Sequence, residues 1–144
     1  MVRVFVVEES TELSRRLVER LAETPGITVI GTAMTVIDAV PKIMVLHPDL
    51  VITDLDLAEG GGFALLEAIR IVRYVEGSAP TVILWTGCQD PLRQAHAREL
   101  GAQVYFDKAR ELELLLDYCR NAVPQTDLGV ALTNPERRPC QPNS

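Results

Sequence analysis

Apolar and polar positions along the chain predict a regular succession of strands and helices. The first block, VRVFVV, is nearly continuous in apolar residues, which is typical of a strand covered on both faces. Between such blocks, apolar residues recur every three or four positions, which indicates amphipathic helices. The predicted strands are residues 2–7, 27–33, 49–54, 81–86 and 103–106.

Local turn chemistry marks where the predicted helices begin and end. Short polar side chains that can cap a helix stand before the apolar stripes, and glycine or proline follows them. The third helix is expected at about 62–75 and the fifth at about 110–123. The expected caps are Ser10 or Thr11, Thr35 and Asp90, and the expected breaks are Pro25-Gly26, His47-Pro48 and Gly101.

Five strand–helix units in tandem, with short links, predict a parallel sheet with helices on both of its faces. The periodic pattern stops after Val123, and residues 124–144 are rich in Pro, Asn and Gln. We therefore expect one domain at 1–123, followed by a flexible tail. The apolar runs are far shorter than a membrane span, and the first one is interpreted as a strand, not a signal peptide.

Composition narrows the class of protein further. The chain has 144 residues, of which 47% are hydrophobic and 24% charged, as expected for one globular domain. Its net charge of -6 argues against nucleic-acid binding through the overall field. The three cysteines, Cys88, Cys119 and Cys140, form no CxxC pair, so we expect neither a zinc site nor a disulfide framework, and a reducing cytoplasm as the location.

Polar residues gather at the carboxyl ends of the predicted strands, where open parallel sheets bind their ligands. Glu8 and Glu9 follow the first strand and Asp54 ends the third. Thr86 ends the fourth strand, and Lys108 lies just past the fifth. Several carboxylates in one crevice repel each other, and a hard divalent cation relieves that repulsion. A carboxylate, Mg²⁺, a lysine and a hydroxyl together suit phosphoryl transfer, with the carboxylate as nucleophile.

In this order and spacing, the residues resemble the receiver domain of bacterial two-component response regulators, over about residues 2–122. The resemblance implies a doubly wound α/β fold of the flavodoxin-like (βα)5 type, with strand order 2-1-3-4-5. The matching residues are the acidic pair Glu8-Glu9, the phosphoacceptor Asp54, the loop glycine Gly62, the hydroxyl of Thr86, the aromatic Tyr105 and Lys108.

By this resemblance, Asp54 accepts phosphate from a histidine kinase or a phosphotransfer protein. Glu9 and Asp54 would bind Mg²⁺ (or Mn²⁺) directly, with the main-chain carbonyl of Asp56. Glu8 would act through a metal-bound water. Asp56 and Cys88 occupy the positions that govern how long the phosphoryl group lasts.

The resemblance also assigns the steps that follow phosphorylation. Lys108 would pair with the phosphoryl oxygens and Thr86 would bond one of them. Tyr105 would then turn inward and change the surface formed by the fourth helix, the fifth strand and the fifth helix, on which a downstream protein binds. A homodimer is compatible with this scheme, whereas direct nucleic-acid or membrane binding is not expected. With no output domain after Val123, we expect a stand-alone receiver that is not an enzyme beyond self-catalysed phosphoryl transfer and hydrolysis.

Two alternatives stay open. The family's acidic pair is usually aspartate, and a glutamate moves its carboxylate by about 1.5 Å, while Mg²⁺ demands near-octahedral placement. The family's prolines are replaced by Ala58 and Ala109. These departures motivate a receiver-like interaction module that is never phosphorylated. A metal-dependent enzyme of the Toprim or haloacid-dehalogenase type, suggested by Asp54-Leu55-Asp56, fits less well, because neither class accounts for the complete set of residues.

Overall fold

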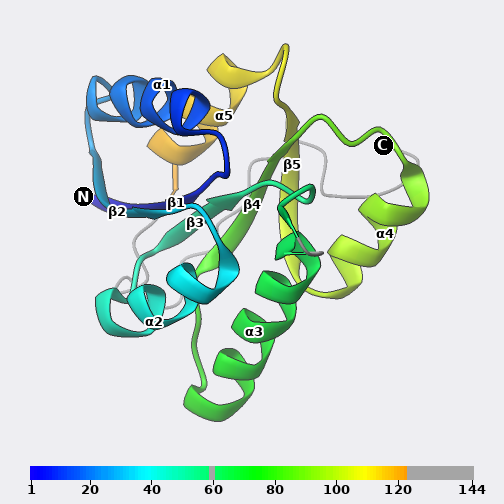
Figure 1. The fold of residues 1–144 in the computed structure, drawn as a ribbon. Coiled ribbons are helices and arrows are strands. Elements are labelled where there is room, and N and C mark those ends of the chain that lie inside the picture. Colours follow the sequence, from blue (N-terminus) through cyan, green and yellow to red (C-terminus); the bar gives the residue numbers. More distant parts are fainter. Residues whose placement is uncertain (59–60, 123–144) are drawn as a thin grey trace.

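Five parallel strands form a single sheet in the order β2-β1-β3-β4-β5, which confirms the predicted topology (Figure 1). The computed structural model describes residues 1–58 and 61–122, so the expected tail and Cys140 lie outside the described residues. The elements in chain order are β1 (Val2–Val7), α1 (Thr11–Ala22), β2 (Ile27–Ala33), α2 (Val36–Leu46), β3 (Leu50–Thr53), α3 (Gly61–Glu76), β4 (Thr81–Thr86), α4 (Pro91–Glu99), β5 (Ala102–Asp107) and α5 (Leu112–Arg120).

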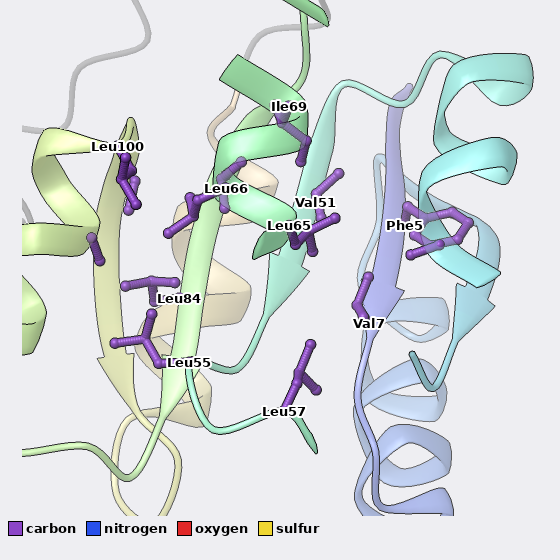
Figure 2. Packing of buried hydrophobic residues seen from close by; sticks show 14 of the residues in the cluster. Phe5, Val7, Val51, Leu55, Leu57, Leu65, Leu66, Ile69, Leu84 and Leu100 are labelled. Atoms are coloured by element: carbon purple, nitrogen blue, oxygen red, sulfur yellow. The ribbon is translucent and has the colours of Figure 1, made fainter. Parts of the chain in front are cut away.

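Helices cover both faces of the sheet, and each face has its own apolar core. Helices α1 and α5 lie on one face, and α2, α3 and α4 lie on the other (Figure 1). Successive strand residues point to opposite faces, so in β1 the side chains of Val4 and Val6 pack under α1 and α5. Phe5 and Val7 pack on the other face, where Figure 2 shows them with residues of β3, α3 and β4. This double burial explains why the strands are almost entirely apolar.

The predicted caps form as expected. The hydroxyl of Ser10 accepts a hydrogen bond from the backbone N–H of Leu13, and Thr35 and Asp90 cap α2 and α4 in the same way. Gly101 has a φ of +110°, in the left-handed region that favours glycine at a helix stop. Among residues 1–58 and 61–122, no helix is both long enough and apolar enough to cross a membrane.

Helix α5 starts two residues later than predicted, at Leu112, and ends at Arg120. The residues before it form a turn closed by Asp107. Its carbonyl accepts the N–H of Glu111 at 2.8 Å, and its carboxylate accepts the N–H of Ala109 at 2.7 Å. This turn occupies the residues up to Glu111, so the helix begins after it. It also places Lys108 at the edge of the sheet.

The strand register brings the functional strand ends to the same level. Val7 pairs with Thr53, and Thr53 pairs with Leu84, so Glu8 and Asp54 are the next residues on adjacent strands. Leu84 pairs with Tyr105, which places Thr86 and Lys108 just beyond the same level on β4 and β5. One edge of the sheet therefore collects all the predicted polar residues.

Gly62, in the first turn of α3, lies against the backbone that leads out of β3. A Cβ atom at this position would stand 2.5 Å from both Cα and O of Leu55 and 2.6 Å from O of Asp54. These are backbone atoms, so no side chain can rotate away to make room. The close approach of α3 to the segment after Asp54 therefore requires glycine.

We predict that Gly62→Ala lowers the free energy of unfolding by about 1–3 kcal/mol, the usual cost of overpacking. Urea unfolding measures this change. Gly87→Ala is the matched control, because a Cβ there meets nothing within 4 Å and its φ is not in the left-handed region. Equal stabilities of the two variants would contradict the proposed close approach.

Candidate functional site

The ammonium group of Lys108 joins two buried carboxylates at the carboxyl edge of the sheet. Its Nζ atom lies 2.6 Å from Oδ2 of Asp54 and 2.6 Å from Oε1 of Glu8. Glu8 is 3% exposed and Asp54 is 7% exposed. Two such carboxylates repel each other and lose their hydration, so a cation shared between them offsets both costs.

Each of the two carboxylates is also held by the backbone of its own loop. Oδ1 of Asp54 accepts the N–H of Asp56 at 3.0 Å. Oε2 of Glu8 accepts the N–H of Ser10, the cap of α1, at 2.8 Å. One oxygen of each carboxylate therefore fixes the loop, and the other faces Lys108.

Lys108 is fixed by its own surroundings as well. Its backbone N–H donates to the carbonyl of Thr86 at 3.0 Å, which ties it to the neighbouring strand. Its Nζ atom stands 5.4 Å from the ring centroid of Trp85, a buried residue, within the range of a cation–π interaction. All peptide bonds in the described parts of the chain are trans, including the one between Lys108 and Ala109.

The hydroxyl group of Thr86 connects the end of β4 to the site. Thr86 is buried, and its Oγ1 accepts the backbone N–H of Cys88 at 3.1 Å. The same hydroxyl stands close enough to the carboxylate of Asp54 to lower its pKa. Asp54 thus accepts hydrogen bonds from its own loop and from the segment after β5, and the hydroxyl at the end of β4 lies nearby.

These contacts set the charges of the site. Burial alone raises the pKa of Asp54, but the N–H of Asp56, the ammonium of Lys108 and the hydroxyl of Thr86 together hold it below its ordinary value of 3.8. Burial also lowers the pKa of Lys108, but its bonds to Asp54 and Glu8 raise it above 10.5. At neutral pH Asp54 is therefore ionised, in the form that a nucleophile needs, beside a charged lysine.

The remaining predicted residues lie around this centre. Glu9 has an exposed side chain, so the glutamate that reaches Lys108 is Glu8. The carboxylate of Asp56 forms an ion pair with Arg93 of α4, at 2.7 Å. Tyr105 is 8% exposed and belongs to the core under α4, so its side chain is already turned inward. Cys88 is buried, close to Arg93.

Two contacts were not predicted from the sequence. One is the contact of Lys108 with the ring of Trp85. Trp85 directly precedes Thr86 at the end of β4, so strand alternation places its ring on the opposite face of the sheet from the Thr86 side chain. This alternation was the signal that could have revealed the contact. The other contact is made by Arg93 of α4. Its pairing with Asp56 joins residues far apart in the sequence and leaves no periodic trace.

The carboxylate oxygens at this edge are suitable ligands for a magnesium ion, although they are few. In the described residues, no group of three or more His, Cys, Asp or Glu side chains forms a metal-binding cluster. Mg²⁺ commonly binds through one or two carboxylates, water and phosphate oxygens. Glu8 and Asp54 provide such a pair, because an oxygen of each already faces a common cation, Lys108.

The family of the chain follows from comparison with known proteins. The model of the response regulator receiver domain matches residues 4–120, so the chain belongs to the receiver family of two-component signalling. A two-component response regulator of the LuxR family from Aurantimonas sp. SI85-9A1 has a similar structure, with a TM-score of 0.72 and 25% identity over 82% of this chain and 81% of that one. The response regulator domain of Thermotoga maritima CheB has a TM-score of 0.68 at 21% identity, over 83% and 94% of the two chains.

The chain also matches a segment of longer, curated proteins. A protein-glutamate methylesterase/protein-glutamine glutaminase of Koribacter versatilis (strain Ellin345) is 31% identical over 76% of this chain, and the match covers 30% of the relative. The corresponding protein of Geobacter sulfurreducens (strain ATCC 51573 / DSM 12127 / PCA) is 36% identical over 74% of this chain and 28% of its own length. The chain thus spans less than a third of these relatives, and it matches them through the receiver domain. Receiver domains are phosphoacceptor signalling modules of two-component systems.

We predict that Lys108→Met lowers the free energy of unfolding at pH 7 by about 2 kcal/mol, between the values for exposed and buried ion pairs. Lys108 lowers the pKa of Asp54 in the folded protein. The stabilisation that this pairing gives the fold is therefore complete above the pKa of an unfolded aspartate, and it is lost as pH falls through the lower pKa of folded Asp54. The difference between wild type and variant should therefore shrink from pH 7 to pH 3.

Urea unfolding at several pH values measures this difference. Lys42→Met is the matched control, because Lys42 forms an exposed pair with Asp38 within α2 and should contribute at most about 0.5 kcal/mol. A loss in Lys108→Met that stays constant from pH 7 to pH 3 would show that the lysine does not act through carboxylate charge.

Proposed function

We propose that Asp54 is the phosphoacceptor of this receiver domain and that it takes its phosphoryl group from a histidine kinase or a phosphotransfer protein. The observation that supports this most strongly is the environment of its carboxylate. It is ionised and buried, it pairs with the ammonium of Lys108, and the hydroxyl of Thr86 nearby helps to lower its pKa. These two donors are suited to the oxygens of an incoming phosphoryl group.

In the proposed reaction, an oxygen of Asp54 forms a bond to phosphorus while the bond from phosphorus to the donor breaks. The electron pair for the new bond comes from the Asp54 carboxylate, and the electron pair of the bond that breaks leaves with the donor group. The phosphoryl oxygens bring their own negative charge, so the negative charge at Asp54 then lies on those oxygens. Lys108 and Thr86 then bond those oxygens instead of the carboxylate. The N–H of Asp56 holds the other carboxylate oxygen and keeps the group oriented.

Glu8, Asp54 and the main-chain carbonyl of Asp56 would hold the Mg²⁺ or Mn²⁺ ion. When bound, the ion supplies positive charge that neutralises phosphoryl oxygens. The sequence favoured Glu9 as the direct ligand and Glu8 as an indirect one. The buried position of Glu8 and the exposure of Glu9 support the reverse assignment.

For the output, we propose a downstream protein that binds the face formed by α4, β5 and α5. Thr86 is the residue best placed to start the change, because its hydroxyl lowers the pKa of Asp54 and accepts the N–H of Cys88 at the start of the loop to α4. Tyr105 is already buried, so this switch does not depend on a further inward turn. We propose no esterase activity for this chain, because its likeness to the esterases concerns the receiver domain. A cytoplasmic location and a homodimer stay predictions.

We predict that acetyl phosphate and Mg²⁺ add one phosphoryl group to the protein and that Asp54→Asn abolishes the addition. Intact-mass spectrometry measures the adduct. Asp56→Asn is the matched control in the same loop and should keep the adduct, since the Asp56 side chain is not the group that bonds to phosphorus. Absence of an adduct with any divalent metal would favour the interaction module that is never phosphorylated.

We predict that Glu8→Gln weakens Mg²⁺ binding by roughly tenfold or more, as expected when a residue that holds the metal is altered, whereas Glu9→Gln changes it less than about twofold because Glu9 is exposed. Both substitutions preserve shape and remove one negative charge. The fluorescence of Trp85, the single tryptophan, offers the readout because Lys108 stands over its ring. A larger effect of Glu9→Gln would restore the assignment made from the sequence.

A further inference from the structure

Arg93, in the first turn of α4, contacts three neighbouring segments beside the site. Its Nη2 atom lies 2.7 Å from Oδ1 of Asp56, in the segment after β3. The guanidinium carbon stands 5.5 Å from the ring centroid of Phe63 in α3. Its Nη1 atom lies 3.6 Å from Sγ of Cys88, in the loop after β4. Arg93 therefore contacts both residues, Asp56 and Cys88, to which the sequence assigned control of the phosphoryl lifetime.

Asp56 connects this arginine to the phosphoacceptor. Its backbone N–H donates to Oδ1 of Asp54, while its carboxylate pairs with Arg93. The three carboxylates of the site thus use two separate cations. Lys108 serves Glu8 and Asp54, and Arg93 serves Asp56.

The charge of Asp56 matters because of what arrives beside it. A phosphoryl group brings negative charge of about -1.5 to -2 to Asp54. A carboxylate two residues away repels that charge, and the repulsion is only partly screened at a half-exposed position. The ion pair of Asp56 with Arg93 carries no net charge, and the Asp56 carboxylate is directed toward α4.

The packing around Arg93 favours arginine over lysine. The Phe63 ring that faces the guanidinium also packs against the ring of His96, at 5.0 Å between centroids. A planar guanidinium can stack on Phe63 and bond Asp56 at the same time, whereas a lysine ammonium acts as a point charge. The contacts with Phe63 and Asp56 together hold the Arg93 guanidinium in one position.

We propose that Arg93 is a positioning residue for phosphorylation: by pairing with Asp56, it cancels the charge of that carboxylate and holds it away from the phosphoryl group on Asp54. This proposal rests on the proposed role of Asp54. It gives α4 an indirect part in the reaction, through a side chain outside the residues that mark the family.

The test is a four-protein charge cycle of wild type, Arg93→Met, Asp56→Asn and the double variant. The rate of phosphorylation by acetyl phosphate at saturating Mg²⁺ is measured by intact mass. Arg93→Met should be slower by roughly two- to fivefold, the range that measured couplings of exposed ion pairs correspond to. The double variant should regain the wild-type rate, because neither charge remains, and Arg93→Lys should be intermediate.

Two further measurements separate charge from structural damage. Arg98→Met removes the same charge from an exposed position of α4 and should leave the rate unchanged. Mg²⁺ affinity, followed by Trp85 fluorescence, should rise in Arg93→Met, because an uncompensated carboxylate attracts the cation and repels the anion. Opposite effects on the two ligands are expected from charge alone.

Three results would overturn the proposal. Equal rates for Arg93→Met and Arg98→Met would show that Arg93 has no special role. A double variant as slow as Arg93→Met would show that Arg93 does not act through Asp56. A fall in both Mg²⁺ affinity and rate would point to structural damage. If wild type itself forms no adduct, the role of Asp54 fails first, and that outcome is distinct from the other three.

Discussion

The structure depends on one interaction, the ammonium of Lys108 between the carboxylates of Asp54 and Glu8. Two buried carboxylates at the ends of adjacent strands would destabilise the sheet edge if nothing compensated them. Lys108 lies 2.6 Å from an oxygen of each. Because the three residues follow β1, β3 and β5, this ion pair also ties together the three loops that begin there.

The same carboxylates organise their own loops. The second oxygen of each carboxylate accepts a hydrogen bond from the backbone N–H two residues further along the chain. This N–H belongs to Asp56 for Asp54, and to Ser10 for Glu8. Ser10 in turn caps α1, so the start of a helix is coupled to the charge of the site. Substitutions at Glu8 therefore act on local structure as well as on chemistry, and a matched glutamate such as Glu9 is needed to separate the two effects.

Much of the fold could be predicted from the sequence because its signals are local. Apolar blocks marked the strands, short polar residues marked the caps, and parallel topology brought the strand ends together. The choice between Glu8 and Glu9 could not be predicted. Both follow the last residue of β1, Val7, so strand alternation no longer applies, and the bond from Ser10 decides which side chain turns inward. The pairing of Arg93 with Asp56 was also missed, because it depends on how α4 packs beside the segment after β3.

The division of three carboxylates between two cations has a consequence for the proposed reaction. A phosphoryl group on Asp54 competes for Lys108, and the ammonium can turn toward the new oxygens with a small movement. Asp56 loses nothing in that step, because its partner Arg93 comes from α4 and is held by Phe63. If Lys108 had to serve all three carboxylates, phosphorylation would leave Asp56 unpaired beside the new charge. Separate cations therefore let the site accept negative charge at Asp54 while the contact between α4 and the segment after β3 stays intact.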